Sequence, residues 1–305
     1  MSRCEQSVVV FNTATLEKII NNPESVLKQE NEFWEKERPQ KLTKQWAENI
    51  GHEIQFDKWR ESMRSWATIP LKERTNHVFM QNARRIIDSK EGFLEKAIPH
   101  ICAFLPEDAK IDITVHFTAF IPSRAFAHQD IVINVNAPYW NENADNIINT
   151  LVHEIFHVGY GYYRDIRKEP PIKNEALYNI LDILVNEGIC TYVAYKALSL
   201  FPAPDEKDYQ MLENFPDIQR LLNDLNSVLA QIGKISDKKL QQLVYEKCIM
   251  GRAFYPPGAY IAKQIDEKKG REILIQKLSE GPRSVIRLYN SLVQRKLRVQ
   301  FDNNV

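Results

Sequence analysis

Two histidines stand four residues apart within an apolar segment, and a glutamate follows the first of them: His153-Glu154-Ile155-Phe156-His157. In an α-helix each residue advances about 100°, so side chains at positions i and i+4 lie about 40° apart on one face. Both imidazoles can then reach a single metal ion. Glu154 lies one step round the helix, badly placed as a third ligand but close to where a water molecule would sit. The pattern indicates a zinc site of the kind used for hydrolysis.

The alternative interpretation is a buried helix that carries two incidental histidines. The segment has a wide apolar stripe, which indicates deep packing: Ile147, Ile148, Leu151, Val152, Ile155 and Phe156. Imidazoles and a carboxylate on such a helix cost free energy unless they are paired or bound to a metal, so the stripe favours the metal site. Asn143 or Asp145 can cap the start of this helix. Gly159 and Gly161 are predicted to end it.

A third protein ligand is needed, because a catalytic zinc ion takes three and leaves one position for water. The acidic candidates downstream are Glu169, Glu175, Asp182 and Glu187. Glu187 lies in the middle of an apolar helical stretch, where a charged residue followed by Gly188 needs a partner. A metal ion supplies that partner, and the glycine lets a second helix approach closely. We therefore favour Glu187 and keep the other three as alternatives.

The charge balance limits the partners that the chain can bind. Its 305 residues include 40 basic and 40 acidic side chains, so the net charge is zero. No basic stripe predicts nucleic-acid binding, and no global field favours a membrane surface. No apolar run reaches the length of a membrane span. Residues 1–6 contain no apolar signal segment, so the sequence as written predicts a cytoplasmic protein, with export as the alternative if a leader has been removed.

The cysteines show no paired spacing along the chain. The four are Cys4, Cys102, Cys190 and Cys248. This pattern is not typical of a disulfide framework or of a cysteine zinc site, so we expect reduced thiols that mostly pack in the core.

Composition and periodicity predict a mainly helical α+β protein. We expect an N-terminal helical region at 1–108 and a second region at 109–305 that contains the metal helix. The second region is predicted to comprise a small sheet at 109–136, metal helices at 144–200 and a helical part at 205–305. Strands are expected at 111–120 and 130–136, where β-branched residues alternate with polar ones. Helices are expected on both sides of the Asn21-Asn22-Pro23 break, after Pro70, at 93–104, from Lys173 or Asn174 to Pro202 and Pro204, and at 215–232, 236–251, 259–269, 271–280 and 282–297.

Aromatic and histidine side chains outside the motif offer further candidates. An aromatic ladder could bind sugar or peptide, although large core anchors are the commoner role; the four tryptophans concerned are Trp34, Trp46, Trp59 and Trp66. His116, in an alternating strand, is predicted to be structural. His128, in a loop, is a candidate for touching substrate.

The motifs together resemble the gluzincin metallopeptidases, which include thermolysin and the zinc aminopeptidases related to leukotriene hydrolase. The resemblance rests on three elements: His153-Glu154-x-x-His157, Asn186-Glu187-Gly188 with Thr191-Tyr192-Val193 after it, and Tyr255-Pro256-Pro257-Gly258. It covers residues 109 to 295 and extends to uncharacterised bacterial families of zinc-dependent peptidases. The Gly-x-Met-Glu-Asn element of the aminopeptidases is absent from the strand region 111–136, and the 29 residues between His157 and Glu187 form a longer interval than in the best-known relatives.

The resemblance implies a zincin-like core, a Zn²⁺ ion and a peptide or small protein substrate. His153, His157 and Glu187 would hold the ion, and Glu154 would act as general base. The Tyr-x-x-Gly element implies that Tyr255 stabilises the oxyanion. The alternative is that Tyr255 is a packing residue at a helix end and that Tyr260 or His128 takes this role. Hydrogen bonds to the ligands are open to three nearby side chains: Asn149, Thr150 and Asp182.

Two other functions remain open at this stage. One is a zinc-stabilised binding or scaffold protein whose active site has lapsed, and the other is a zinc hydrolase that acts on a small ester or epoxide. Glu154 favours an enzyme over a scaffold, because a structural zinc site has no use for a base.

Overall fold

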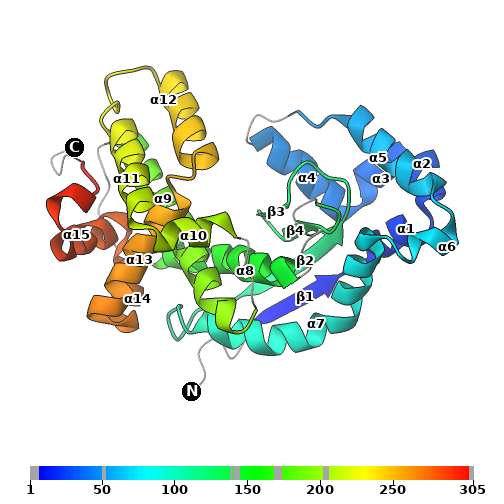
Figure 1. The fold of residues 1–305 in the computed structure, drawn as a ribbon, viewed down its shortest axis with the longest axis horizontal. Helices are drawn as coiled ribbons and strands as arrows, with labels where there is room; N and C mark the ends of the chain where they lie inside the picture. The colour runs from blue at the N-terminus through cyan, green and yellow to red at the C-terminus, as the bar shows by residue number, and fades with distance from the viewer. Residues whose placement is uncertain are drawn as a thin grey trace.

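The fold is a small sheet almost surrounded by helices, as predicted. The computed structural model describes residues 7–49, 53–137, 140, 145–167, 174–201 and 206–301. Figure 1 shows the N-terminal helices on the right and the C-terminal helices on the left, with α8 between them and α9 among the C-terminal helices. The prediction of a predominantly helical α+β protein with a small sheet before the metal helix is confirmed.

The N-terminal part begins with a strand and continues as helices. Its elements are β1 (Val8–Asn12), α1 (Ala14–Asn21), α2 (Pro23–Lys28), α3 (Glu30–Lys36), α4 (Arg38–Asn49), α5 (Phe56–Thr68), α6 (Leu71–Arg74) and α7 (Val78–Cys102). Trp34, Trp59 and Trp66 are buried to 3% exposure or less, so three of the four tryptophans are core anchors.

Four strands form one sheet in the order β1-β2-β4-β3. β2 (Asp112–Thr118) and β4 (Ile131–Asn134) confirm the two predicted strands. β3 (Ala125–Ala127) pairs antiparallel with β4 at one edge, and β1 pairs parallel with β2 at the other. Neither edge strand was predicted. β3 is too short for alternation to reveal, and β1 depends on a partner about one hundred residues away.

Helices α8 (Asp145–Ile166) and α9 (Glu175–Lys196) cross the centre of the molecule and pack on each other. The side chain of Asn174 accepts a hydrogen bond from the amide of Leu177 at 3.0 Å, which caps α9 where predicted. The other candidate caps, Asn143 and Lys173, lie outside the described residues.

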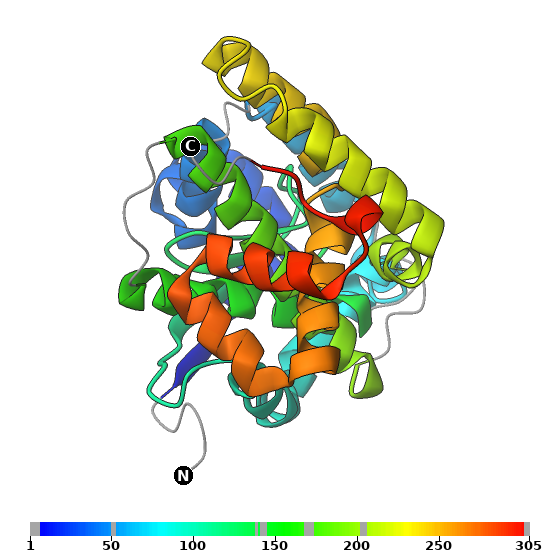
Figure 2. The same ribbon diagram turned by 90° about the vertical axis from the view of Figure 1, so that its left-hand side faces the viewer.

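The C-terminal part is helical throughout. Its elements are η2 (Ala197–Ser199), α10 (Lys207–Glu213), α11 (Phe215–Leu229), α12 (Asp237–Val244), the π-helical turn η3 (Tyr245–Met250), α13 (Tyr255–Lys269), α14 (Arg271–Glu280), α15 (Pro282–Leu292) and η4 (Arg295–Leu297). Figure 2 shows α11 and α12 running side by side above the orange and red helices. The division of the chain into residues 1–108 and 109–305 stays a prediction.

Three predicted helix boundaries are wrong. α8 does not end at Gly159 or Gly161 but continues to Ile166. A Cβ on Gly159 would lie 2.8 Å from a methyl carbon of Leu105, so this glycine permits close packing instead of ending the helix. α9 ends at Lys196, before Pro202 and Pro204, which lie outside the described residues.

The third wrong boundary concerns α7. The helices expected after Pro70 and at 93–104 are largely one helix, which runs unbroken through Gly92. A glycine inside a helix costs about 1 kcal/mol. Burial of Phe93, Ala97 and Ile101 along one face offsets that cost.

The prediction of reduced cysteines is confirmed at two positions and wrong at one. Cys190 and Cys248 are free and buried. Cys102 is disulfide-bonded. Sequence spacing gave no sign of this bond, because a disulfide requires only that two Cβ atoms meet in space.

Within the described residues, none of the helices has both the length and the apolar character needed to cross a lipid bilayer.

Candidate metal centre

Helix α8 places the histidine motif between the core and a large cavity. Its apolar stripe is buried at Ile147, Leu151, Val152, Ile155 and Phe156, each at most 2% exposed. The opposite face lines a cavity of about 1360 Å³, and the side chains of the motif lie on this face. A stripe at helical spacing therefore turns the histidines and Glu154 toward the cavity.

Three possible metal ligands converge at the floor of this cavity. Nε2 of His153 lies 3.0 Å from Nε2 of His157. The Oε2 atom of Glu187 lies 3.5 Å from the first nitrogen and 3.6 Å from the second. Among the described residues this is the one group of three or more metal-ligating side chains that could hold an ion.

These distances fit a tetrahedral zinc ion. Two ligand atoms that each lie about 2.1 Å from such an ion are roughly 3.4 Å apart. The three distances of 3.0, 3.5 and 3.6 Å bracket that value. Two imidazole nitrogens and one carboxylate oxygen are also ligands that zinc prefers. His153, His157 and Glu187 could therefore hold zinc and leave a fourth position facing the cavity.

A close helix crossing holds Glu187 in place. A Cβ added to Gly188 would lie 2.3 Å from the Cα of Gly258, and one added to Gly258 would lie 2.4 Å from the carbonyl oxygen of Leu184. No side chain fits at either position, so the backbones of α9 and α13 touch. The prediction that Gly188 lets a second helix approach is confirmed. The crossing fixes Glu187 next to the first turn of α13, where Tyr255 is the first residue.

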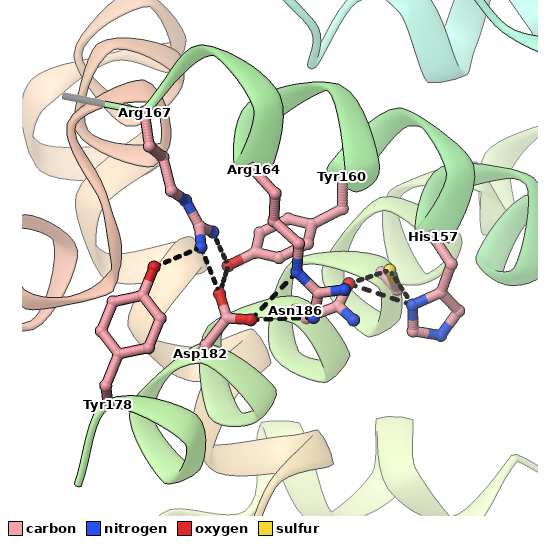
Figure 3. Close-up of polar contacts among 8 residues, drawn as sticks. His157, Tyr160, Arg164, Arg167, Tyr178, Asp182 and Asn186 are labelled. Carbon is pink, nitrogen blue, oxygen red and sulfur yellow. Dashed lines mark hydrogen bonds and ion pairs between the residues drawn. The ribbon is translucent and has the colours of Figure 1, made fainter. Parts of the chain in front are cut away.

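The ring of His157 is oriented from α9. Its Nδ1 lies 3.0 Å from Oδ1 of Asn186 and 3.2 Å from Sγ of Cys190 (Figure 3). When Nδ1 carries the proton, it donates a hydrogen bond to this amide oxygen and leaves Nε2 free to bind a metal. The sequence pointed to Asn186 only as part of the Asn-Glu-Gly run, and this hydrogen bond was not predicted.

The electrostatics keep Glu187 charged. Burial would raise the pKa of its carboxyl, but the neighbouring imidazoles of His157 and His153 outweigh that effect and hold the pKa below its usual value. An ionised carboxylate between two imidazoles is suited to a divalent cation.

Glu154 and Tyr255 lie on the wall of the same cavity. Glu154 is 8% exposed, and its carboxylate has no hydrogen-bond partner within the described part of the chain. Burial raises the pKa of the Tyr255 hydroxyl, the charge of Glu187 raises it further, and Arg252 acts in the opposite direction. Tyr255 therefore stays protonated and can donate a hydrogen bond into the cavity.

The other candidate ligands are placed elsewhere. Glu175 is exposed at the start of α9, and Glu169 lies outside the described residues. Asp182 binds Arg164, Arg167 and Tyr160 at the far end of α8 (Figure 3). Its hydrogen bonds thus brace the two helices, and they do not go to a metal-ligating side chain.

Of the remaining candidates, Asn149, Thr150 and His128 line the cavity, whereas Tyr260 does not. Asn149 and Thr150 line it, but Asn149 donates to the carbonyl of Ala194 at 2.7 Å and does not bond a histidine. His128 lines the cavity and lies 3.1 Å from the side-chain amide of Asn49. Tyr260 packs edge-to-face on Tyr289, away from the residues that line the cavity.

His116 is buried and lies 3.4 Å from Asp130. Burial lowers the pKa of its imidazole, although Asp130 opposes the shift. These contacts accord with the structural role predicted for it.

Two features of the cavity were missed. Trp46 stacks on Phe126 of β3 with the ring centroids 5.0 Å apart, so this tryptophan lines the cavity together with an edge strand. Arg252 lies beside Tyr255, and its guanidinium carbon is 3.3 Å from the centroid of the tyrosine ring. Nothing in the local sequence around Arg252 signals this contact.

Comparison with known proteins gives a family. Residues 27–297, from α2 to η4, match a family described as "Putative zinc dependent peptidase (DUF5700)". Comparison with curated proteins and comparison with solved structures each find no match. Because the family match spans most of the 305 residues and includes the whole metal centre, the chain belongs to the family so described.

Proposed function

We propose that the protein is a gluzincin-type zinc metallopeptidase that hydrolyses peptide bonds in the cavity above α8. The observation that carries the proposal is the meeting of three ligand atoms, 3.0 to 3.6 Å apart, on the cavity floor that Glu154 also lines. Family membership supports zinc and peptide chemistry. The Asn186-Glu187-Gly188 run and its contact with Gly258 support the gluzincin assignment.

Each side chain has a role that its position supports. His153, His157 and Glu187 hold the ion, which when bound acidifies water and polarises a carbonyl group. Glu154 takes a proton from the attacking water and passes it to the leaving amine. The protonated hydroxyl of Tyr255 donates a hydrogen bond to the developing oxyanion.

The shape of the cavity supports a peptide as substrate. Its volume of about 1360 Å³ is larger than the 300–1,000 Å³ typical of sites for small molecules. β3 forms one edge of the sheet and lines the cavity, so an extended peptide could add to that edge as a further strand. The stacked rings of Trp46 and Phe126 offer an apolar surface beside it.

The test is the substitution Glu154→Gln, measured for zinc content and for cleavage of a quenched-peptide library. We expect one zinc per chain to persist while turnover falls by about 10²- to 10⁴-fold, the usual contribution of a general base. Glu175→Gln, at an exposed position on the first turn of α9, serves as the control and should keep full turnover. Unchanged turnover in Glu154→Gln would remove Glu154 as the base.

The same assay separates the other functions. Stoichiometric zinc without cleavage of any peptide in the wild type would favour a zinc-stabilised scaffold. Cleavage of small esters or epoxides in the absence of peptide cleavage would favour a different zinc hydrolase.

A further inference from the structure

The backbone at Arg252 adopts a conformation that side chains rarely tolerate. Its φ is +67°, and Phe120 is the other described non-glycine residue with a positive φ. Such a conformation costs about 1–3 kcal/mol and persists only where the surroundings enforce it. At Phe120 the side chain of Asn134 closes the turn by accepting from the Phe120 amide at 3.1 Å. Arg252 follows the end of the π-helical turn η3, where helices commonly close with a left-handed residue, and its amide donates to the carbonyl of Ile249 at 3.3 Å.

Asp208, on the first turn of α10, holds this side chain. Nε of Arg252 donates to Oδ1 of Asp208 at 3.0 Å, and an Nη2 hydrogen bond to Oδ2 makes the pair bidentate. Asp208 is 6% exposed, so the carboxylate end of the pair is buried. Two parallel charge-assisted hydrogen bonds fix both the position and the plane of a guanidinium group.

The fixed guanidinium covers one face of the Tyr255 ring. Its central carbon lies 3.3 Å from the ring centroid, the distance of direct stacking. The backbone carbonyl of Arg252 also accepts a hydrogen bond from the Tyr255 amide at 3.3 Å. One turn further along α13, Gly258 packs directly against the backbone of α9.

The hydroxyl of Tyr255 is available to hydrogen-bond a ligand. It lines the cavity and has no hydrogen-bond partner among the residues that the structure describes. A phenol whose ring is fixed and whose hydroxyl is unpaired is preorganised to donate to a group that enters the cavity.

We infer that Arg252, held by Asp208, is a positioning residue that fixes the ring of Tyr255 so that its hydroxyl meets the reacting carbonyl. The inference rests on the proposed function. It gives a common role to the bidentate pair with Asp208 and to the stacking of the guanidinium on the Tyr255 ring.

A double-mutant cycle on turnover tests the inference. Arg252→Lys keeps the positive charge beside Asp208 but removes the flat stacking surface. We expect kcat to fall about 10- to 100-fold with little change in KM, because a donor displaced by about 1 Å loses that much. In the Tyr255→Phe background the same substitution should change kcat less than about twofold, since the hydroxyl it positions is gone. Asp208→Asn should behave in the same way and provides a second route if Arg252→Lys folds poorly.

A matched control is available in the same chain. Arg271 lies 3.8 Å from the centroid of Phe104 and pairs with Asp266 at 3.4 Å, with side-chain exposure of 35% against 34% for Arg252. It does not line the cavity. Arg271→Lys removes the same kind of stacked guanidinium and should leave kcat and KM unchanged.

A readout without zinc or substrate makes the inference independent of activity. With 3-fluorotyrosine in place of Tyr255, the metal-free protein should give one dominant ¹⁹F resonance, because one ring orientation is held. Arg252→Lys should split or broaden it, and Arg271→Lys should leave it unchanged.

The outcomes separate the two proposals. Absence of peptidase activity in the wild type would contradict the proposed function, while the ¹⁹F spectra would still decide whether Arg252 positions the ring. A ¹⁹F resonance unaffected by Arg252→Lys would overturn the inference. So would a loss of kcat that persists in full in the Tyr255→Phe background, or a loss expressed only in KM, because Arg252 would then act on substrate directly.

Discussion

Two clusters of charged side chains lie between helices α8 and α9. The clusters differ in the partners that their carboxylates have. At one end Asp182 binds Arg164, Arg167 and Tyr160, so the carboxylate has two cations and a hydroxyl as partners (Figure 3). At the other end Glu187 faces two imidazoles, and Glu154 has no hydrogen-bond partner in the described part of the chain. In the first cluster the carboxylate is thus bound by both arginines and by the tyrosine hydroxyl, as expected of a brace.

In the second cluster the carboxylate of Glu187 faces the imidazoles of His153 and His157, and these three side chains could hold a metal ion. The network around Asp182 therefore joins the two helices, while the cluster around Glu187 is the candidate metal centre. Substitutions at the two ends should separate metal binding from stability.

The largest effect is expected from Glu187→Ala. Removing one of three ligands should weaken zinc binding by about 10³-fold or more, since structural zinc sites are worth about 10–16 kcal/mol in total. The metal-free protein should keep most of its stability, because Glu187 does not brace the helices. Competition with a chelating zinc indicator measures the affinity, and urea unfolding measures the stability. Retention of wild-type affinity would remove Glu187 as a ligand.

The reverse pattern is expected from Asp182→Ala. It leaves Arg167, whose side chain is 6% exposed, without its carboxylate, and such a loss costs about 3–5 kcal/mol of unfolding free energy. Arg164→Gln is the control: the Arg164 side chain is 47% exposed, so its loss should cost at most about 1 kcal/mol. Zinc stoichiometry should remain one per chain in both. If Asp182→Ala lost zinc as fully as Glu187→Ala, the two clusters would not be separable.

The smallest effect is expected from Asn186→Ala. Asn186 lies on α9 between Asp182 and Glu187. The substitution removes the acceptor 3.0 Å from Nδ1 of His157 and should weaken zinc binding about 10- to 100-fold. Asn186→Asp keeps an acceptor oxygen and should restore most of the affinity. An unchanged affinity in Asn186→Ala would mean that Cys190, 3.2 Å from the same nitrogen, is enough to orient the ring.

The meeting of the three side chains was predictable because it depends on local rules. Two histidines at helical spacing must share a face, and a glutamate in an apolar helix needs a partner. The prediction that Gly188 lets a second helix approach closely rested on the same local reasoning, and it is confirmed. The same reasoning failed for Gly159. This glycine was predicted to end a helix, but it instead permits close packing against Leu105. The sequence alone does not reveal which neighbour a glycine will face.

Features that depend on distant partners were not predictable. β1 pairs with β2 across about one hundred residues, and Arg252 is held by Asp208, 44 residues away. The bond at Cys102 is of the same kind. In each case the determining interaction forms only when the chain has folded.

The most direct test of the account is a crystal of the zinc-loaded protein, measured on both sides of the zinc absorption edge. The account predicts one strong anomalous peak in the cavity, about 2.0–2.2 Å from Nε2 of His153, Nε2 of His157 and a carboxylate oxygen of Glu187. A peak at other side chains, or none at these three when zinc is in excess, would contradict it.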